Sequence, residues 1–141
     1  MNIYFSCSIT GGRRDQAVYQ HIVDHLAALG HEVPTAHLSR ADVMEDEQVV
    51  DALTVYNRDV KWVEACDALV AEVSTPSHGV GYEIALALFL DKPVLCCYRQ
   101  GTKVSKMLLG NTHDRIKILE YADEPALFAA LDHFLRDSKF L

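Results

Sequence analysis

Hydrophobic residues alternate along the chain between short continuous runs and longer stretches with helical spacing. Short apolar runs are typical of strands that are buried on both faces of a sheet. Gly30 follows the first helical stretch, at the position where a glycine commonly ends a helix. The pattern predicts strands at residues 3–7, 32–37, 67–73, 94–98 and 116–120, and helices at residues 15–29, 47–66, 79–90, 103–109 and 125–135. Strands separated by helices predict an α/β fold with a mostly parallel sheet that is covered on both faces.

The composition limits the classes of function. The chain has 141 residues, of which 50% are hydrophobic, so we expect one globular domain over residues 1–141. The net charge is −7, and no basic cluster occurs beyond Arg13 and Arg14, which argues against binding to nucleic acid or to an anionic membrane. We expect neither a signal peptide nor a membrane-spanning segment, because the apolar runs are too short.

The cysteines indicate a reducing compartment. They lack the C-x-x-C spacing of metal and redox sites, and we expect buried free thiols in a cytoplasmic protein. Adjacent residues of a strand point to opposite faces of the sheet, so the paired cysteines of the fourth predicted strand should be separated. The four residues are Cys7, Cys66, Cys96 and Cys97.

Glu83 is a carboxylate in an otherwise apolar helix. Residues 84–90 are all apolar, which predicts a helix that is buried on all sides, where an unpaired carboxylate is costly. We expect Glu83 in the first turn, where the helix dipole would keep it ionised. An ionised carboxylate at the carboxyl edge of a parallel sheet, where ligands bind, suits a nucleophile. A glutamate that serves only the helix dipole or a cap gives the same pattern.

Asp59 interrupts a second apolar stripe, in the predicted helix at residues 47–66. Helical spacing predicts that this stripe faces the core. Two carboxylates in one cleft are the usual equipment for cleaving glycosidic bonds, here extended from O-glycosides to N-glycosides. An ion pair with Arg58 or Lys61 is the structural alternative. The stripe consists of Ala52, Val55, Tyr56, Asp59, Val63 and Cys66.

Hydroxyl side chains and glycines follow the first and third predicted strands. Turns of this composition at helix N-termini bind phosphate. Neither G-x-x-x-x-G-K-[ST] nor G-x-G-x-x-G occurs, so neither of these two nucleotide-binding loops is present. His37, at the end of the second predicted strand, is the histidine best placed for a ligand. The hydroxyl residues are Ser6, Ser8 and Thr10 before Gly11 and Gly12, and Ser74, Thr75 and Ser77 before Gly79.

Three blocks of sequence resemble the 2′-deoxynucleoside 5′-phosphate N-hydrolases of the nucleoside 2-deoxyribosyltransferase superfamily. They are YFSCSITGGR at residues 4–13, DVKW at residues 59–62 and AEVSTPSHGVGYE at residues 71–83. The likeness runs from about residue 2 to about residue 121, and the order and spacing of the blocks make it more specific than any one of them.

The resemblance implies a Rossmann-like, flavodoxin-like three-layer sandwich with a five-stranded parallel sheet of strand order 2-1-3-4-5. It implies that Glu83 attacks the anomeric carbon of the sugar, that Asp59 assists proton transfer and that Tyr4 holds Glu83 in place. It implies a homodimer in which Ser105 reaches the phosphate of the neighbouring subunit, and a reaction without metal or cofactor. The remaining substrate-binding residues would be Ser8, Ile9, Thr10, Gly12, His37, Ser77 and Gly79.

Two positions depart from the family pattern. The chain has Thr10 where family members often have arginine, and Cys7 where they have glycine. Ser77 and Ser105 stand where deoxyribosyltransferases proper carry Asp or Asn, which favours a nucleotide substrate. The alternatives are transfer of deoxyribose between bases, hydrolysis of ribonucleotides such as CMP, and a nucleotide sensor without turnover.

Overall fold

The centre of the molecule is a parallel β-sheet. The computed structural model describes residues 1–9, 14–40 and 49–137. In this part of the chain the sheet has four strands in the order β1-β2-β3-β4, all parallel to their neighbours. The strands are β1 (Ile3–Ser6), β2 (Ala68–Glu72), β3 (Val94–Arg99) and β4 (Ile116–Tyr121).

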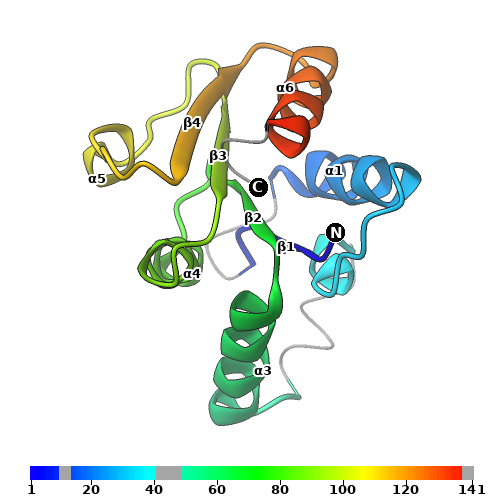
Figure 1. The fold of residues 1–141 in the computed structure, drawn as a ribbon, viewed down its shortest axis with the longest axis vertical. Helices are drawn as coiled ribbons and strands as arrows, with labels where there is room; N and C mark the ends of the chain where they lie inside the picture. The colour runs from blue at the N-terminus through cyan, green and yellow to red at the C-terminus, as the bar shows by residue number, and fades with distance from the viewer. Residues whose placement is uncertain (10–13, 41–48, 138–141) are drawn as a thin grey trace.

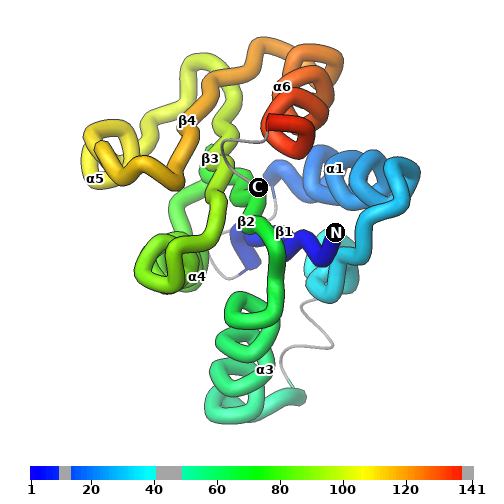
Figure 2. Tube along the Cα trace, viewed as in Figure 1, coloured from blue at the N-terminus to red at the C-terminus, as the bar shows by residue number. Residues whose placement is uncertain are grey.

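Helices cover both faces of this sheet, so the fold has three layers (Figure 1). One face is covered by α1 (Gln16–Ala28) and α6 (Glu124–Arg136), which lie side by side in Figure 2. The other face is covered by α3 (Ala52–Ala65) and α4 (His78–Phe89). Two short helices, η1 (Ala36–Ser39) and α5 (Lys106–Leu109), complete the described elements. The prediction of an α/β fold with a parallel sheet is therefore confirmed.

Alternation along the strands divides the core into two apolar clusters. Phe5 of β1 and Cys97 of β3 pack with α1 and α6, whereas Tyr4 and Cys96 pack with α3 and α4. The two adjacent cysteines therefore lie on opposite faces, as the period of two along a strand predicts. All four cysteines are buried and free, as expected.

The predicted strand at residues 32–37 is wrong, and with it the five-stranded sheet of order 2-1-3-4-5. Glu32 makes a single parallel bridge beside β1, in which the Ile3 N–H donates to the Glu32 carbonyl over 2.8 Å. Pro34 then has no N–H to continue the ladder. The Phe5 N–H bonds instead to the Thr35 hydroxyl over 3.0 Å, and the chain turns into η1.

Local capping explains where the helices begin and end. The Asp51 carboxylate accepts the Thr54 N–H over 3.0 Å, so α3 begins at Ala52, later than the predicted residue 47. Residues 41–48, which include the first two residues of the predicted helix at residues 47–66, lie outside the described part of the chain. Gly30 has a φ of 82° and follows the end of α1, which confirms the predicted stop.

Candidate active site

A cavity of about 460 Å³ opens between α3 and α4. Cys7 and Ile9, which follow β1, and Ser77 and Gly79, which follow β2, form part of its wall. The cavity therefore lies at the carboxyl ends of β1 and β2, the edge at which ligands bind in open α/β sheets. Its volume falls in the range of small-molecule sites, which is about 300–1,000 Å³.

The wall opposite α4 is the apolar stripe of α3. Val63 is the single buried residue of this helix, and Cys66, which follows the helix, is also buried. The expectation that the stripe faces the core holds for these two residues and is wrong for the others, which are partly or fully exposed. The others face the cavity instead, across from α4. The stripe residues that line the cavity are Ala52, Val55, Tyr56, Asp59 and Val63, together with the neighbouring Val60.

Glu83 lines the cavity from α4 and is held by two hydroxyl groups. The Tyr4 hydroxyl donates to Oε1 over 2.9 Å, and the Ser6 hydroxyl donates to Oε2 over 2.5 Å. The first turn of α4 contains no acidic residue, so Glu83 lies in the second turn and not in the expected first turn. The helix dipole weakens beyond the first turn, and the two hydroxyl groups replace it as the stabilising contacts.

The pKa of Glu83 is raised to about 7, chiefly by burial and also by the nearby Asp59 carboxylate. The hydrogen bonds from Ser6 and Tyr4 lower it, because they favour the charged form. The expectation of a carboxylate that is simply kept ionised is thus corrected: Glu83 takes up and releases a proton near neutral pH. Burial also raises the pKa of Tyr4 far above its usual value, so its phenol stays protonated and continues to donate.

Asp59 lies on α3 and forms an ion pair with its neighbour Arg58, with 2.8 Å between Oδ1 and Nε. The Arg58 guanidinium also lies over the Trp62 ring, 5.1 Å from its centroid. The His37 ring also contacts Trp62, edge to face, with 5.8 Å between the two ring centroids. His37 packs against α3 in this way and does not line the cavity, although its neighbour Leu38 does.

The structure brings some of the remaining predicted residues to the cavity and leaves others apart. Ile9, Ser77 and Gly79 line it, while Ser8 is fully buried. Ser105 caps α5 and lines a different cavity of about 780 Å³, between α4 and α5, which shares Ser77 with the first. Thr10 and Gly12 lie outside the described residues.

Sequence reasoning missed two sets of residues at this site. Ser6 was grouped with the phosphate-binding hydroxyls, yet it bonds to Glu83; its position two residues after Tyr4 on one strand is the signal that both face the same side. The place of Tyr56 and Tyr82 at the cavity was also missed, since Tyr56 was expected to face the core. They line the cavity from α3 and α4, with their hydroxyl oxygens 3.4 Å apart and their rings edge to face.

Neither a cluster of metal ligands nor a membrane-spanning helix is found among the described residues. Among them, no three His, Cys, Asp or Glu side chains gather as metal ligands would. Within the same residues, every helix is too short or too polar to cross a bilayer.

Proteins that are named as nucleotide N-hydrolases are similar to this chain. A protein of Methanosarcina mazei, "Putative 2′-deoxynucleoside 5′-phosphate N-hydrolase 1", is 38% identical over 135 residues, covering 96% of this chain and 84% of that protein. The 5-hydroxymethyl-dUMP N-hydrolase of Mus musculus is 39% identical over 128 residues, covering 87% of this chain and 73% of that protein.

The fold and a family profile agree with these similarities. The structure of the Clostridium botulinum CMP N-glycosidase matches with a TM-score of 0.72 and 17% identity, over 95% of this chain and 99% of that one, a likeness that concerns the fold. The sequence profile described as nucleoside 2-deoxyribosyltransferase matches residues 3–124. That range contains the whole cavity, including both of its carboxylates and the tyrosine and serine that hold one of them. The chain belongs to the nucleoside 2-deoxyribosyltransferase family.

Proposed function

We propose that the protein hydrolyses the N-glycosidic bond of 2′-deoxynucleoside 5′-monophosphates, yielding the free base and deoxyribose 5-phosphate. The observation that carries the proposal is the Glu83 carboxylate, fixed by Tyr4 and Ser6 in the wall of a nucleotide-sized cavity beside Asp59. The names of the relatives from Methanosarcina mazei and Mus musculus, both N-hydrolases of this substrate class, support the same reaction.

Glu83 is assigned as the nucleophile. Its ionised carboxylate forms a bond to the anomeric carbon while the bond from that carbon to the base breaks, and the base leaves with the electron pair and takes up a proton. Water then forms a bond to the anomeric carbon and gives up a proton, which replaces the one taken up by the base, while the ester bond to Glu83 breaks and the carboxylate is regained. Tyr4 and Ser6 hold the attacking oxygens in place through both steps. Asp59, the second carboxylate of the wall, assists proton transfer.

The 5′-phosphate is assigned to the N-terminal end of α4. Backbone N–H groups at the start of a helix bind anions, and this end carries Ser77 and Gly79, which line the cavity. Ser8, which follows β1, is assigned to the phosphate as well, as are Thr10 and Gly12 by the family resemblance, with Ile9 against the sugar and base. His37 is assigned to the base side, where it acts through its contact with Trp62.

A homodimer is part of the proposal. The outer face of α4 is exposed in the single chain, contrary to the expectation of a helix buried on all sides: Phe89 is 87% exposed, and Met107 of α5 is 84% exposed. A second copy that covers this apolar face would bring its own Ser105 near Ser77, the residue that lines both cavities. The four buried free thiols favour a reducing, cytoplasmic compartment.

The test is release of free base from the four deoxynucleoside monophosphates, the four ribonucleoside monophosphates and the unphosphorylated deoxynucleosides, followed by chromatography. We expect the deoxynucleoside monophosphates to be cleaved best. Addition of a second free base distinguishes hydrolysis from transfer of deoxyribose, because only a transferase forms a new nucleotide. Binding without base release from any substrate would contradict the proposal and indicate a sensor.

A further inference from the structure

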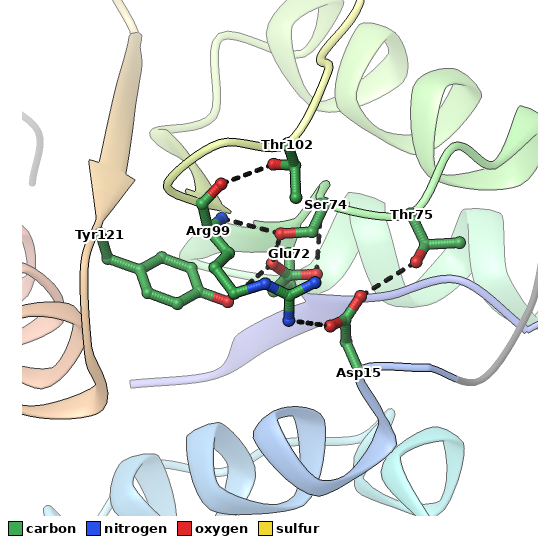
Figure 3. A network of polar contacts seen from close by, with 7 residues as sticks. All are labelled: Asp15, Glu72, Ser74, Thr75, Arg99, Thr102 and Tyr121. Atoms are coloured by element: carbon green, nitrogen blue, oxygen red, sulfur yellow. Dashed lines mark hydrogen bonds and ion pairs between the residues drawn. The ribbon is translucent and has the colours of Figure 1, made fainter.

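Glu72 is the centre of a second buried polar cluster, drawn in Figure 3. It is the last residue of β2 and is fully buried. The Ser74 hydroxyl donates to Oε1, and the Tyr121 hydroxyl donates to the same oxygen over 3.0 Å. The mechanism proposed above uses none of these groups.

The cluster continues to the start of α1. The almost fully buried Asp15 forms an ion pair with the Arg99 guanidinium and accepts the Thr75 hydroxyl over 3.0 Å. The Arg99 N–H donates to the Ser74 oxygen over 2.8 Å, which joins the two halves of the cluster (Figure 3). Its contacts therefore tie the segment after β2 to the start of α1 and to the ends of β3 and β4.

Glu72 and the cavity lie on opposite faces of the sheet. Along β2, Val70 packs with α1 and α6, so the period of two places Glu72 on that side, together with Tyr121. Glu83 lies on the other side, where Tyr4 packs with α3 and α4. Glu72 is therefore not a second catalytic group of the cavity.

The segment at residues 74–77 links the cluster to the cavity. Its first two residues, Ser74 and Thr75, are hydrogen-bonded within the cluster, and its last, Ser77, caps α4 and lines the cavity. Pro76 lies between them and restricts the backbone, because its ring fixes φ. A shift of Ser74 is therefore passed on to Ser77 and to the first N–H groups of α4.

We propose that Glu72, acting through Ser74, is a positioning residue for recognition of the 5′-phosphate. It touches no substrate; it holds the segment whose far end presents Ser77 and the start of α4 to the cavity. The inference rests on the proposed function, since it assumes that this helix end binds the phosphate.

The test compares a deoxynucleoside monophosphate with its deoxynucleoside in the wild type, Ser74→Ala and Tyr121→Phe. Ser74→Ala removes the bridge between Glu72 and Arg99, so KM for the nucleotide should rise about tenfold, while kcat and the deoxynucleoside kinetics stay within about twofold. Tyr121→Phe removes one of the two donors, so a rise of about threefold is expected. The dissociation constant of deoxyribose 5-phosphate, measured by calorimetry, should rise by the same factors.

Two control variants separate positioning from general stability. Leu131→Ala opens the buried core beside α6 and leaves every polar contact of the cluster in place, so any effect should be equal for both substrates. Ser74→Thr keeps the hydroxyl and should retain the nucleotide KM of the wild type. Equal changes for both substrates in Ser74→Ala, or an unchanged dissociation constant for deoxyribose 5-phosphate, would overturn the positioning role. Equal cleavage of both substrates by the wild type would instead overturn the phosphate site of the proposed function.

Discussion

Glu72 and Glu83 are two carboxylates held in the same way on opposite faces of one sheet. Each accepts hydrogen bonds from one serine and one tyrosine, and burial raises the pKa of both. They differ in access: Glu83 is partly exposed in the wall of a cavity, whereas Glu72 is fully buried and faces the Asp15–Arg99 ion pair. The donors are Ser6 and Tyr4 for Glu83, and Ser74 and Tyr121 for Glu72.

This difference shows what distinguishes a nucleophile from a structural carboxylate in this protein. A raised pKa and two hydroxyl donors are common to both, so neither feature identifies the reactive group. Access to a cavity with a second carboxylate belongs to Glu83 alone of the two. The following predictions test whether the functional difference follows that access.

Replacing the two glutamates should have very different effects. Glu83→Ala removes the attacking oxygen, so base release should fall by at least about a thousandfold with an unchanged circular dichroism spectrum. Glu72→Gln keeps an acceptor for Ser74 and Tyr121, so kcat should stay within about tenfold. A Glu83→Ala activity within tenfold of the wild type, about 1.4 kcal/mol of barrier, would rule out the nucleophile.

In the proposed dimer, Ser105 of a second subunit completes the site of Glu83, whereas Glu72 is hydrogen-bonded within its own chain. Glu83→Ala and Ser105→Asp homodimers should each be inactive, the latter because a negative charge is placed beside the phosphate. After random reassembly, half of the dimers are mixed, and each has one site with both wild-type residues. About a quarter of wild-type activity should return, from the two-fold symmetry. Chain exchange that is proven by mass without any recovery would show that Ser105 acts within its own chain or not at all.

The hydroxyl groups that donate to Glu83 should affect the chemical step, whereas the Tyr121 hydroxyl that donates to Glu72 should not. Tyr4→Phe or Ser6→Ala removes a hydrogen bond to a charged group, so kcat/KM should fall about 10- to 100-fold. Each of these bonds lowers the pKa of Glu83, so its loss should move the acid limb of the pH profile from about pH 7 to higher pH. The matched variant Tyr121→Phe should leave that limb in place. A limb that stays fixed in all three variants would mean that another group titrates there.

The smallest expected effect is on stability. The folded pKa of Glu83, about 7, exceeds the ordinary value of 4.5, so the folded protein binds more protons between these pH values. Its contribution to stability is therefore present at low pH and is lost as the pH rises through that window. Glu83→Gln should be more stable than the wild type at pH 8 by about 3 kcal/mol, with little difference at pH 4. Urea unfolding at both pH values measures this difference in stability. Equal stability of the variant and the wild type at pH 8 would mean that burial does not destabilise the ionised carboxylate.

Local pattern predicted most elements, and its failures at the second strand and at the place of Glu83 also have local causes. Gly30 and the adjacent Cys96 and Cys97 follow from helix ending and strand alternation alone. The second strand failed because Pro34 interrupts the ladder after one bridge. The expectation for Glu83 failed because the N-cap Ser77 starts α4 at His78, which makes Glu83 the sixth residue of the helix; even from the predicted start at residue 79 it lies beyond the first turn.

For the candidate site, the sequence supplied the residue types but not their contacts. The pairing of Tyr4 with Glu83 came from a family resemblance, and the structure adds Ser6 to the same carboxylate. The Glu72 cluster was not predicted, since Tyr121 is 49 positions from Glu72, and Arg99 is 84 positions from Asp15. Such contacts depend on strand order and register, which no single stretch of sequence encodes.

Helix α3 forms one wall of the cavity but contributes little to the buried core. Only Val63 of its fourteen residues is buried, although the helix forms one wall of the cavity. Surface substitutions of this kind usually change stability by about 0.5 kcal/mol or less, so residues such as Val55 and Tyr56 are free to vary without endangering the fold. Substitutions at these positions would therefore change the wall of the cavity, while the sheet and the hydrogen bonds of Glu72 and Glu83 stay unchanged.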